Sequence, residues 1–350
     1  MSIKIAYITL GCKLNYAETS TYERELSKAG FEAVPWSKGA DVFVVNTCTV
    51  TEHSDKKSRN IIRKLHRQNP HARIFVTGCS AQLRRADYEA IEGVVRVFGA
   101  TEKSLVVPYI IQNTSGTDCC GHDISTFFPA YSSGERTRSF LKVQDGCDYK
   151  CHYCTVPYAR GESRNIPIAD IIPQAEAIAA EGIKEIVLTG VNTGDFGKST
   201  GETFFELIKQ LNEVEGIERY RISSIEPNLL TEDMIDWIVT GTKFLPHYHI
   251  PLQSGCDTIL KEMGRRYDTA AFAHKIQYIR EKTEVPGGPK VFFGIDVIVG
   301  FPGETDELFM ETYNFLKDVV KPAFIHIFPY SRRAGTPAAE RKDQVQDSIK

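Results

Sequence analysis

Strand-like apolar runs alternate with polar, helix-like stretches through most of this 350-residue chain. Three such runs near the amino terminus lead into Cys12, Cys48 and Cys79. Alternating strands and helices predict parallel sheets with right-handed crossovers, in which functional groups gather at the carboxyl ends of the strands. We therefore expect these three cysteines to converge in space. Three buried free cysteines are the alternative, since cysteine is a common core residue, but three equivalent positions favour one shared site.

The alternation resumes after a segment rich in Ser, Thr, Gly, Asp and Pro, which is typical of a linker. The expected strands of this second part lie at 139–143, 185–189, 219–223, 247–250, 291–299 and 324–328. Six such strands predict a partial barrel and not a closed eight-stranded one. The fold class is thus α/β, with an N-terminal Rossmann-like parallel-sheet domain and a partial (β/α)6 barrel. The expected boundaries are 1–112 for the first domain, 113–136 for the linker and 137–345 for the barrel.

A second cysteine set, Cys147, Cys151 and Cys154, lies in one short loop after the first barrel strand. The spacing C-x3-C-x2-C, with Tyr153 before the last cysteine, offers three thiolates and no fourth. A four-iron cluster takes four ligands, so three cysteines leave one iron open to a small molecule. This loop resembles that of the radical S-adenosylmethionine (SAM) enzymes, in which the open iron binds the amino acid end of SAM.

The alternatives for this loop are a zinc site, a disulfide or chance spacing. Structural zinc sites have four protein ligands, and His152 lies too close in the loop to complete one easily. Disulfide frameworks belong to short secreted chains, whereas this chain shows no export signal and no apolar stretch long enough to span a membrane. We expect a cytoplasmic protein, in which Cys119, Cys120 and Cys256 are incidental.

Small or polar residues follow several of the predicted barrel strands and are candidates to bind SAM. Glycine allows close backbone approach, amides bind an amino acid zwitterion, hydroxyls and a carboxylate suit a ribose, and an apolar side chain can flank adenine. Turn formation and helix capping are the alternative roles for any one of them. The candidates are Tyr153, Gly190, Asn192, Ser224, Glu226, Gln253 and Val299.

Taken together, these motifs resemble one family, the methylthiotransferases, over nearly the whole chain. The matching segments are Gly11–Asn15, Asn46–Cys48, Thr77–Cys79, Gly146–Arg164, Pro251–Gly255 and Gly300–Thr305. The run from Cys12 to Thr19 is similar to the branch that acts on N6-threonylcarbamoyladenosine in tRNA. The isopentenyladenosine branch usually has Gln-Met where this chain has Lys13-Leu14.

The resemblance implies a transferase of sulfur-containing groups that adds a methylthio group to carbon 2 of threonylcarbamoyladenosine next to the anticodon. It implies two [4Fe-4S] clusters, SAM, an external electron donor and a sulfur donor. The loop cluster would cleave SAM to a 5′-deoxyadenosyl radical, and the cluster at Cys12, Cys48 and Cys79 would deliver sulfur. Family members usually carry a C-terminal TRAM RNA-binding domain, which this chain is expected to lack.

Three alternatives stay open at this point. The substrate can be isopentenyladenosine in tRNA or a ribosomal protein, or the chain can be a noncatalytic iron–sulfur protein that binds RNA. Net charge is −3, so the overall balance does not indicate nucleic-acid binding. One predicted helix is nevertheless strongly basic, and it favours a tRNA anticodon loop as partner unless it is only a solvated face. Its cations are Lys56, Lys57, Arg59, Arg63, Lys64 and Arg67.

Overall fold

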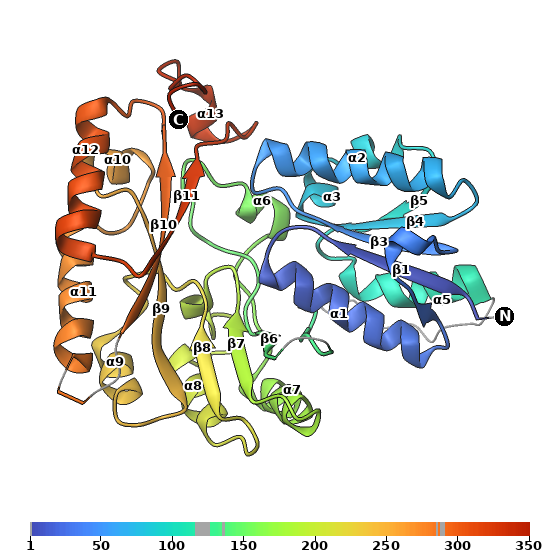
Figure 1. Cartoon of the computed structure of the whole chain (residues 1–350), viewed down its shortest axis with the longest axis horizontal. Coiled ribbons are helices and arrows are strands. Elements are labelled where there is room, and N and C mark those ends of the chain that lie inside the picture. Colours follow the sequence, from blue (N-terminus) through green and yellow to red (C-terminus); the bar gives the residue numbers. More distant parts are fainter. Residues whose placement is uncertain (1, 116–126, 135–136, 285, 288–290) are drawn as a thin grey trace.

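Two parallel β-sheets, each with its own helices, form the two parts of the molecule (Figure 1). The computed structural model describes residues 2–115, 127–134, 137–284, 286–287 and 291–350. Cys119 and Cys120, like most of the expected linker 113–136, lie outside the described residues. The α/β class, the N-terminal parallel sheet and the partial barrel are confirmed.

The first sheet has five strands, all parallel, in the order β2-β1-β3-β4-β5. This is the order of doubly wound, flavodoxin-like sheets, in which the switch point lies between β1 and β3. Its strands are β1 Lys4–Thr9, β2 Glu32–Ala33, β3 Val42–Thr47, β4 Arg73–Gly78 and β5 Val94–Val97. Its helices are α1 Lys13–Lys28, α2 Glu52–Gln68, α3 Cys79–Leu83, α4 Arg85–Glu89 and α5 Val106–Ser115.

The second sheet has six parallel strands in sequential order, β6 to β11, and stays open between β6 and β11. Its strands are β6 Ser139–Lys142, β7 Glu185–Thr189, β8 Arg219–Ile222, β9 Phe244–Gln253, β10 Phe292–Val299 and β11 Phe324–Pro329. Its helices are α6 Val156–Arg160, α7 Ile168–Ala180, α8 Phe204–Asn212, α9 Glu232–Ile238, α10 Asp257–Glu262, α11 Thr269–Thr283, α12 Asp306–Asn314 and α13 Pro337–Glu340.

Side-chain patterns explain these elements. Strand β3 is buried at all six positions, because apolar clusters cover both faces of the first sheet. In the barrel, apolar residues of the strands and of α7, α8, α9 and α11 form one large core. Hydroxyl or carboxylate side chains cap many of the helices, as Thr51 does at α2 and Thr231 at α9, where each accepts a backbone N–H of the first turn.

Several boundaries differ from the sequence-based expectations. Helix α1 begins at Lys13, directly after a cysteine that makes no capping bond, so the usual start signal is missing. The helix-like stretch after the third cysteine, near 81–91, forms two short helices that meet at Arg84. Strand β9 extends to both sides of the expected 247–250, although it contains Pro251.

The two parts contact each other at both edges of the open barrel sheet. Helix α1 lies against β6, and the segment just before β6 packs between them, with Phe127 and Ala130 buried. After β11 the chain returns to the first part, where Arg333 donates to Asp55 of α2 at 2.6 Å and to the Thr49 hydroxyl at 2.6 Å. Among the residues described, no helix is long and apolar enough to cross a lipid bilayer.

Candidate functional site

Cys12, Cys48 and Cys79 follow β1, β3 and β4, so all three lie at the carboxyl edge of the first sheet. Glycines let the chain turn there: Gly11 has φ of +100°, and a Cβ on it would lie 2.7 Å from the Cys48 sulfur. Burial raises the pKa of Cys48 to about 12, and the negative charges of Cys12 and Cys79 also raise it. The structure therefore brings the three thiols into mutual electrostatic range, as the strand-end argument predicts.

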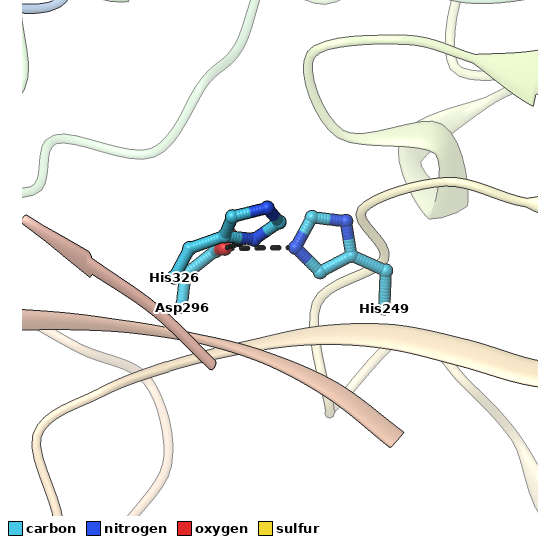
Figure 2. Close-up of side chains that lie close together, drawn as sticks. All are labelled: His249, Asp296 and His326. Atoms are coloured by element: carbon cyan, nitrogen blue, oxygen red, sulfur yellow. Dashed lines mark hydrogen bonds and ion pairs between the residues drawn. The ribbon is translucent and has the colours of Figure 1, made fainter. Parts of the chain in front are cut away.

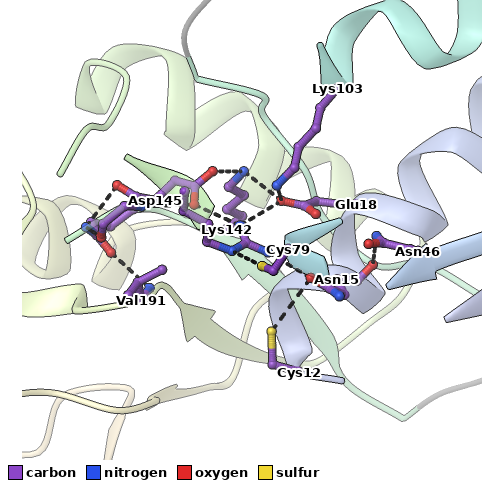
Figure 3. Close-up of polar contacts among 12 residues, drawn as sticks. Cys12, Asn15, Glu18, Asn46, Cys79, Lys103, Lys142, Asp145 and Val191 are labelled. Atoms are coloured by element: carbon purple, nitrogen blue, oxygen red, sulfur yellow. Dashed lines mark hydrogen bonds and ion pairs between the residues drawn. The ribbon is translucent and has the colours of Figure 1, made fainter. Parts of the chain in front are cut away.

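Arg160, at the end of α6, connects this cysteine set to the barrel. Figure 3 labels its partners Cys79, Asn15, Glu18 and Asp145. The Nε of Arg160 donates to the Cys79 sulfur at 3.1 Å, and its other nitrogens donate to Asn15, Glu18 and Asp145 at 2.7–3.1 Å. The guanidinium is 3% exposed. Helix α6 begins only two residues after Cys154, so one short segment links the two cysteine sets.

The buried charges around Arg160 balance only when a sulfur is counted. Lys103, Lys142 and Arg160 supply three cations, and Glu18 and Asp145 supply two carboxylates, all at most 3% exposed. An unpaired buried charge is costly, and a Cys79 thiolate supplies the third anion. Burial raises the pKa of Cys79 while Arg160 and Lys103 oppose that rise, so a bound metal is needed to keep the sulfur deprotonated at neutral pH.

The loop with Cys147, Cys151 and Cys154 shows the same kind of sulfur environment. Backbone N–H groups of Tyr149 and Val156 lie 3.4 Å from the sulfurs of Cys147 and Cys154. Arg265 donates to Cys151 at 3.2 Å, so each cysteine set has one arginine on one of its sulfurs. Hydrogen bonds to cluster sulfurs are among the features that set iron–sulfur potentials. Both sets thus fit iron–sulfur clusters by the chemistry of their donors.

Burial keeps the thiols of this loop protonated without a metal. Burial, together with the negative charge of the neighbouring loop cysteines, raises the pKa of Cys147 to about 11 and that of Cys154 to about 12. Because a thiolate is the metal ligand, these thiols have to lose their protons when a metal binds. No fourth protein sulfur joins either set among the described residues.

Two adjoining cavities open between the sheets at these cysteines. The larger cavity, about 540 Å³, is lined by Cys12 and Cys48 on one side and by the ends of β7 to β11 on the other. The smaller cavity, about 330 Å³, is lined by Cys154 and neighbouring barrel residues. Four residues border both cavities: Val50, Thr51, Asp296 and Phe328. A ligand held at one cysteine set is therefore next to a ligand held at the other.

The candidate SAM residues divide between these cavities and their surroundings. Tyr153 and Gln253 line the smaller cavity, whereas Gly190 and Ser224 line the larger one. Glu226 is paired with Arg265, the arginine that contacts Cys151. Val299 packs against the barrel core, next to Ile298, which lines the smaller cavity. The assignment of these residues to SAM stays a prediction.

Two of these candidates carry features that are unusual without a ligand. Asn192 is 3% exposed, and neither its amide nitrogen nor its amide oxygen has a hydrogen-bond partner among the described residues. Gln253 has φ of 68°, a left-handed conformation that residues other than glycine rarely adopt outside functional sites. Both observations fit a polar ligand bound beside the cysteine loop.

Sequence reasoning missed several residues of the site. Gln144 is fully buried and its Oε1 accepts the N–H groups of Val191 and Asn192 at 2.9 Å, while its amide nitrogen donates to the Gly146 carbonyl. It thus connects the cysteine loop to the turn after β7. His249, Asp296 and His326 form a polar cluster on the wall of the larger cavity (Figure 2). The one sequence signal for Gln144 is its position directly after the strand expected at 139–143.

The basic helix is α2, which starts at the rim of the larger cavity, where Thr51 and Ser54 line it. Five of its six cations are exposed, and Arg59 is half-buried. Lys56 pairs with Glu52 within the helix, and Lys64 lies over the Trp36 ring. The helix therefore presents a row of cations that leads away from the cavity.

Comparisons with known proteins agree with this geometry. The family described as "Uncharacterized protein family UPF0004" matches residues 4–99, and the Radical SAM superfamily matches 141–316. The Bacillus subtilis threonylcarbamoyladenosine tRNA methylthiotransferase MtaB is 42% identical, over 99% of this chain and 77% of that protein. The tRNA-2-methylthio-N(6)-dimethylallyladenosine synthase of Carboxydothermus hydrogenoformans is 34% identical, over 98% of this chain and 80% of that protein. The radical SAM methyltransferase TsrM from Kitasatospora setae shares the fold, with a TM-score of 0.66 and 14% identity. The match covers 97% of this chain and 77% of that protein.

Proposed function

The chain belongs to the tRNA methylthiotransferases of the radical SAM superfamily, and from this we propose that it adds a methylthio group to carbon 2 of N6-threonylcarbamoyladenosine beside the anticodon. The observation that carries the proposal is the pair of adjoining cavities, each bordered by one cysteine set. An adenine in the larger cavity would lie between a source of sulfur and a source of radicals.

The loop residues Cys147, Cys151 and Cys154 would hold a [4Fe-4S] cluster, and Cys12, Cys48 and Cys79 would hold a second one. A four-iron cluster at the loop supplies the electron that cleaves SAM. Arg265 and Arg160 stabilise one thiolate of each set. The unpaired amide of Asn192 would bind the polar end of SAM, and Gln253 and Tyr153 would border it from the smaller cavity.

Partners follow from the same chemistry. The exposed cations of α2 would contact tRNA phosphates, because phosphate contacts supply most of the sequence-independent affinity of RNA-binding surfaces. An external electron donor and a sulfur donor would serve the two clusters. The domain boundaries 1–112 and 137–345 stay predictions, although the two family matches lie within them.

The test is mass analysis of tRNA nucleosides from a strain that lacks this gene. We expect loss of 2-methylthio-threonylcarbamoyladenosine and accumulation of its precursor without the methylthio group. The intact gene should restore the product, and a gene with Cys48→Ala should not. Loss of the methylthio group from isopentenyladenosine, or from a ribosomal protein, would identify one of the alternative substrates and refute the proposal.

A further inference from the structure

Three neighbouring strands place a histidine, an aspartate and a histidine on the wall of the larger cavity. His249 comes from β9, Asp296 from β10 and His326 from β11 (Figure 2). One oxygen of Asp296 lies 2.8 Å from His249 Nε2 and 3.0 Å from His326 Nδ1. Asp296 and His326 are direct partners in the strand register, so the arrangement follows from the sheet itself.

This geometry fixes which ring atoms face the cavity. Burial raises the pKa of Asp296, but hydrogen bonds and charge interactions with the two imidazoles lower it further, and the net shift is downward. An ionised carboxylate accepts hydrogen bonds only, so both nearest ring nitrogens carry protons. The hydrogen bonds of the two rings within the described part of the chain use His249 Nε2 and His326 Nδ1, which leaves His249 Nδ1 and His326 Nε2 for a ligand.

The cluster faces the first cysteine set across the larger cavity. Cys12, Cys48 and Lys13 line the opposite wall, together with Ser223 and Ser224 at the end of β8. The sulfur and radical chemistry proposed above assigns no role to the two imidazoles. A divalent metal is the rival occupant, because one ligand atom from each of the three side chains lies within 4.8 Å of the others. Hydrogen bonds from the two rings to one Asp296 oxygen already hold the three side chains together without a metal.

We propose that His249 and His326, held in place by Asp296, bind the threonylcarbamoyl substituent of the substrate adenosine, with Lys13 facing its carboxylate. This inference rests on the proposed function and names the residues that select its substrate. The substituent offers a carboxylate, a hydroxyl and carbamoyl N–H groups, whereas an isopentenyl group offers none of these. A cavity wall built for hydrogen bonds rejects an apolar analogue, because its polar groups would be left unpaired.

The test measures binding of short anticodon stem-loop RNAs to the anaerobic holoenzyme. The three RNAs carry threonylcarbamoyladenosine, its carboxylate methyl ester, or isopentenyladenosine. His326→Leu and His249→Leu should each weaken binding of the first RNA by about 10- to 100-fold, the value of one hydrogen bond to a charged group. The same variants should change binding of the isopentenyl RNA by less than about twofold. The ester should bind the wild type more weakly than the free carboxylate does.

His274→Leu is the matched control, because this imidazole is 70% exposed on α11 and lies outside the larger cavity. It should leave all three affinities unchanged. Iron content and the circular dichroism spectrum should match the wild type in every variant, which shows that the variants fold.

The outcomes separate this inference from the proposed function. A wild-type enzyme that does not methylthiolate the threonylcarbamoyl RNA would refute the proposed function itself. A wild type that does so, with leucine variants that keep its affinity and selectivity, would refute only the binding role of the two histidines. The purified holoenzyme could instead contain one equivalent of zinc or manganese that is lost in His326→Leu. That result would also refute the binding role of the two histidines and identify a metal site.

Discussion

Arg160 offers the sharpest test of how the two halves are held together, and Arg160→Gln is the perturbation. The guanidinium makes four side-chain hydrogen bonds in a fully buried network. Removing one partner of a buried ion pair costs about 3–5 kcal/mol. Glu18 keeps Lys103 and Lys142, and Asp145 keeps Lys142 and Arg164, so the lower end of that range applies.

A loss of about 3 kcal/mol should lower the midpoint of thermal unfolding by roughly 4 °C in a chain of this size. Circular dichroism of the anaerobically reconstituted protein measures it. Arg219→Gln is the control, because this arginine is 44% exposed and pairs with the exposed Glu218, while its other partner Glu185 keeps Arg221. Such pairs are worth about 0–1 kcal/mol. An Arg160 variant that melts within about 1 °C of the Arg219 variant would refute the reasoning.

Three further predictions concern the clusters and tRNA. The reconstituted protein should bind about eight irons, the sum of two four-iron clusters, and alanines at the three loop cysteines should remove about half. Cys147→Ala should abolish 5′-deoxyadenosine formation, whereas Cys12→Ala should keep it and stop methylthio product formation, because the SAM candidates Tyr153 and Gln253 line the cavity at the cysteine loop. Glutamates at the α2 residues Lys57, Arg63 and Lys64 should weaken tRNA binding and reduce its salt slope by roughly 0.7–0.9 per lost phosphate contact.

Each of these predictions has an outcome that contradicts it. Iron near four in the wild type would exclude a second cluster. Equal loss of SAM cleavage in the two cysteine variants would exclude the division of roles between the sets. For α2, glutamates at Lys261 and Lys317, two exposed lysines of the barrel, are the control. A salt slope that falls equally in both sets would show that α2 is only a solvated face.

Sequence periodicity predicted the sheets and the convergence of the first cysteine set, because both follow from local patterns. Strand β7 has the expected bounds of Glu185–Thr189, and Cys12, Cys48 and Cys79 follow buried parallel strands as anticipated. The positions of all six cysteines in the fold could thus be read from strand-like runs and their ends. Their role as metal ligands stays a prediction.

The polar network could not be predicted in the same way. Glu18 and Arg160 are 142 positions apart in the chain, and no periodicity connects them. Helix α6 has five residues, too few for an amphipathic pattern to appear. The histidine cluster depends on the register of β9, β10 and β11, which a single sequence does not fix. The sequence therefore predicted the individual strands, but it could not predict which side chains pair across them.

The attachment of the first half at both edges of the open barrel sheet limits how the molecule can move. Glu18 on α1 is tied to Lys142 of β6, and Asp55 on α2 is tied to Arg333 beyond β11. Relative motion of two domains is the usual expectation when their interface is small, but a second contact at the opposite edge of the sheet leaves fewer directions in which the halves can rotate. We therefore expect the separation between the two cysteine sets to change little during the reaction. The adenine is then expected to reach the cavities by flipping out of the anticodon loop, with little contribution from movement of the two halves.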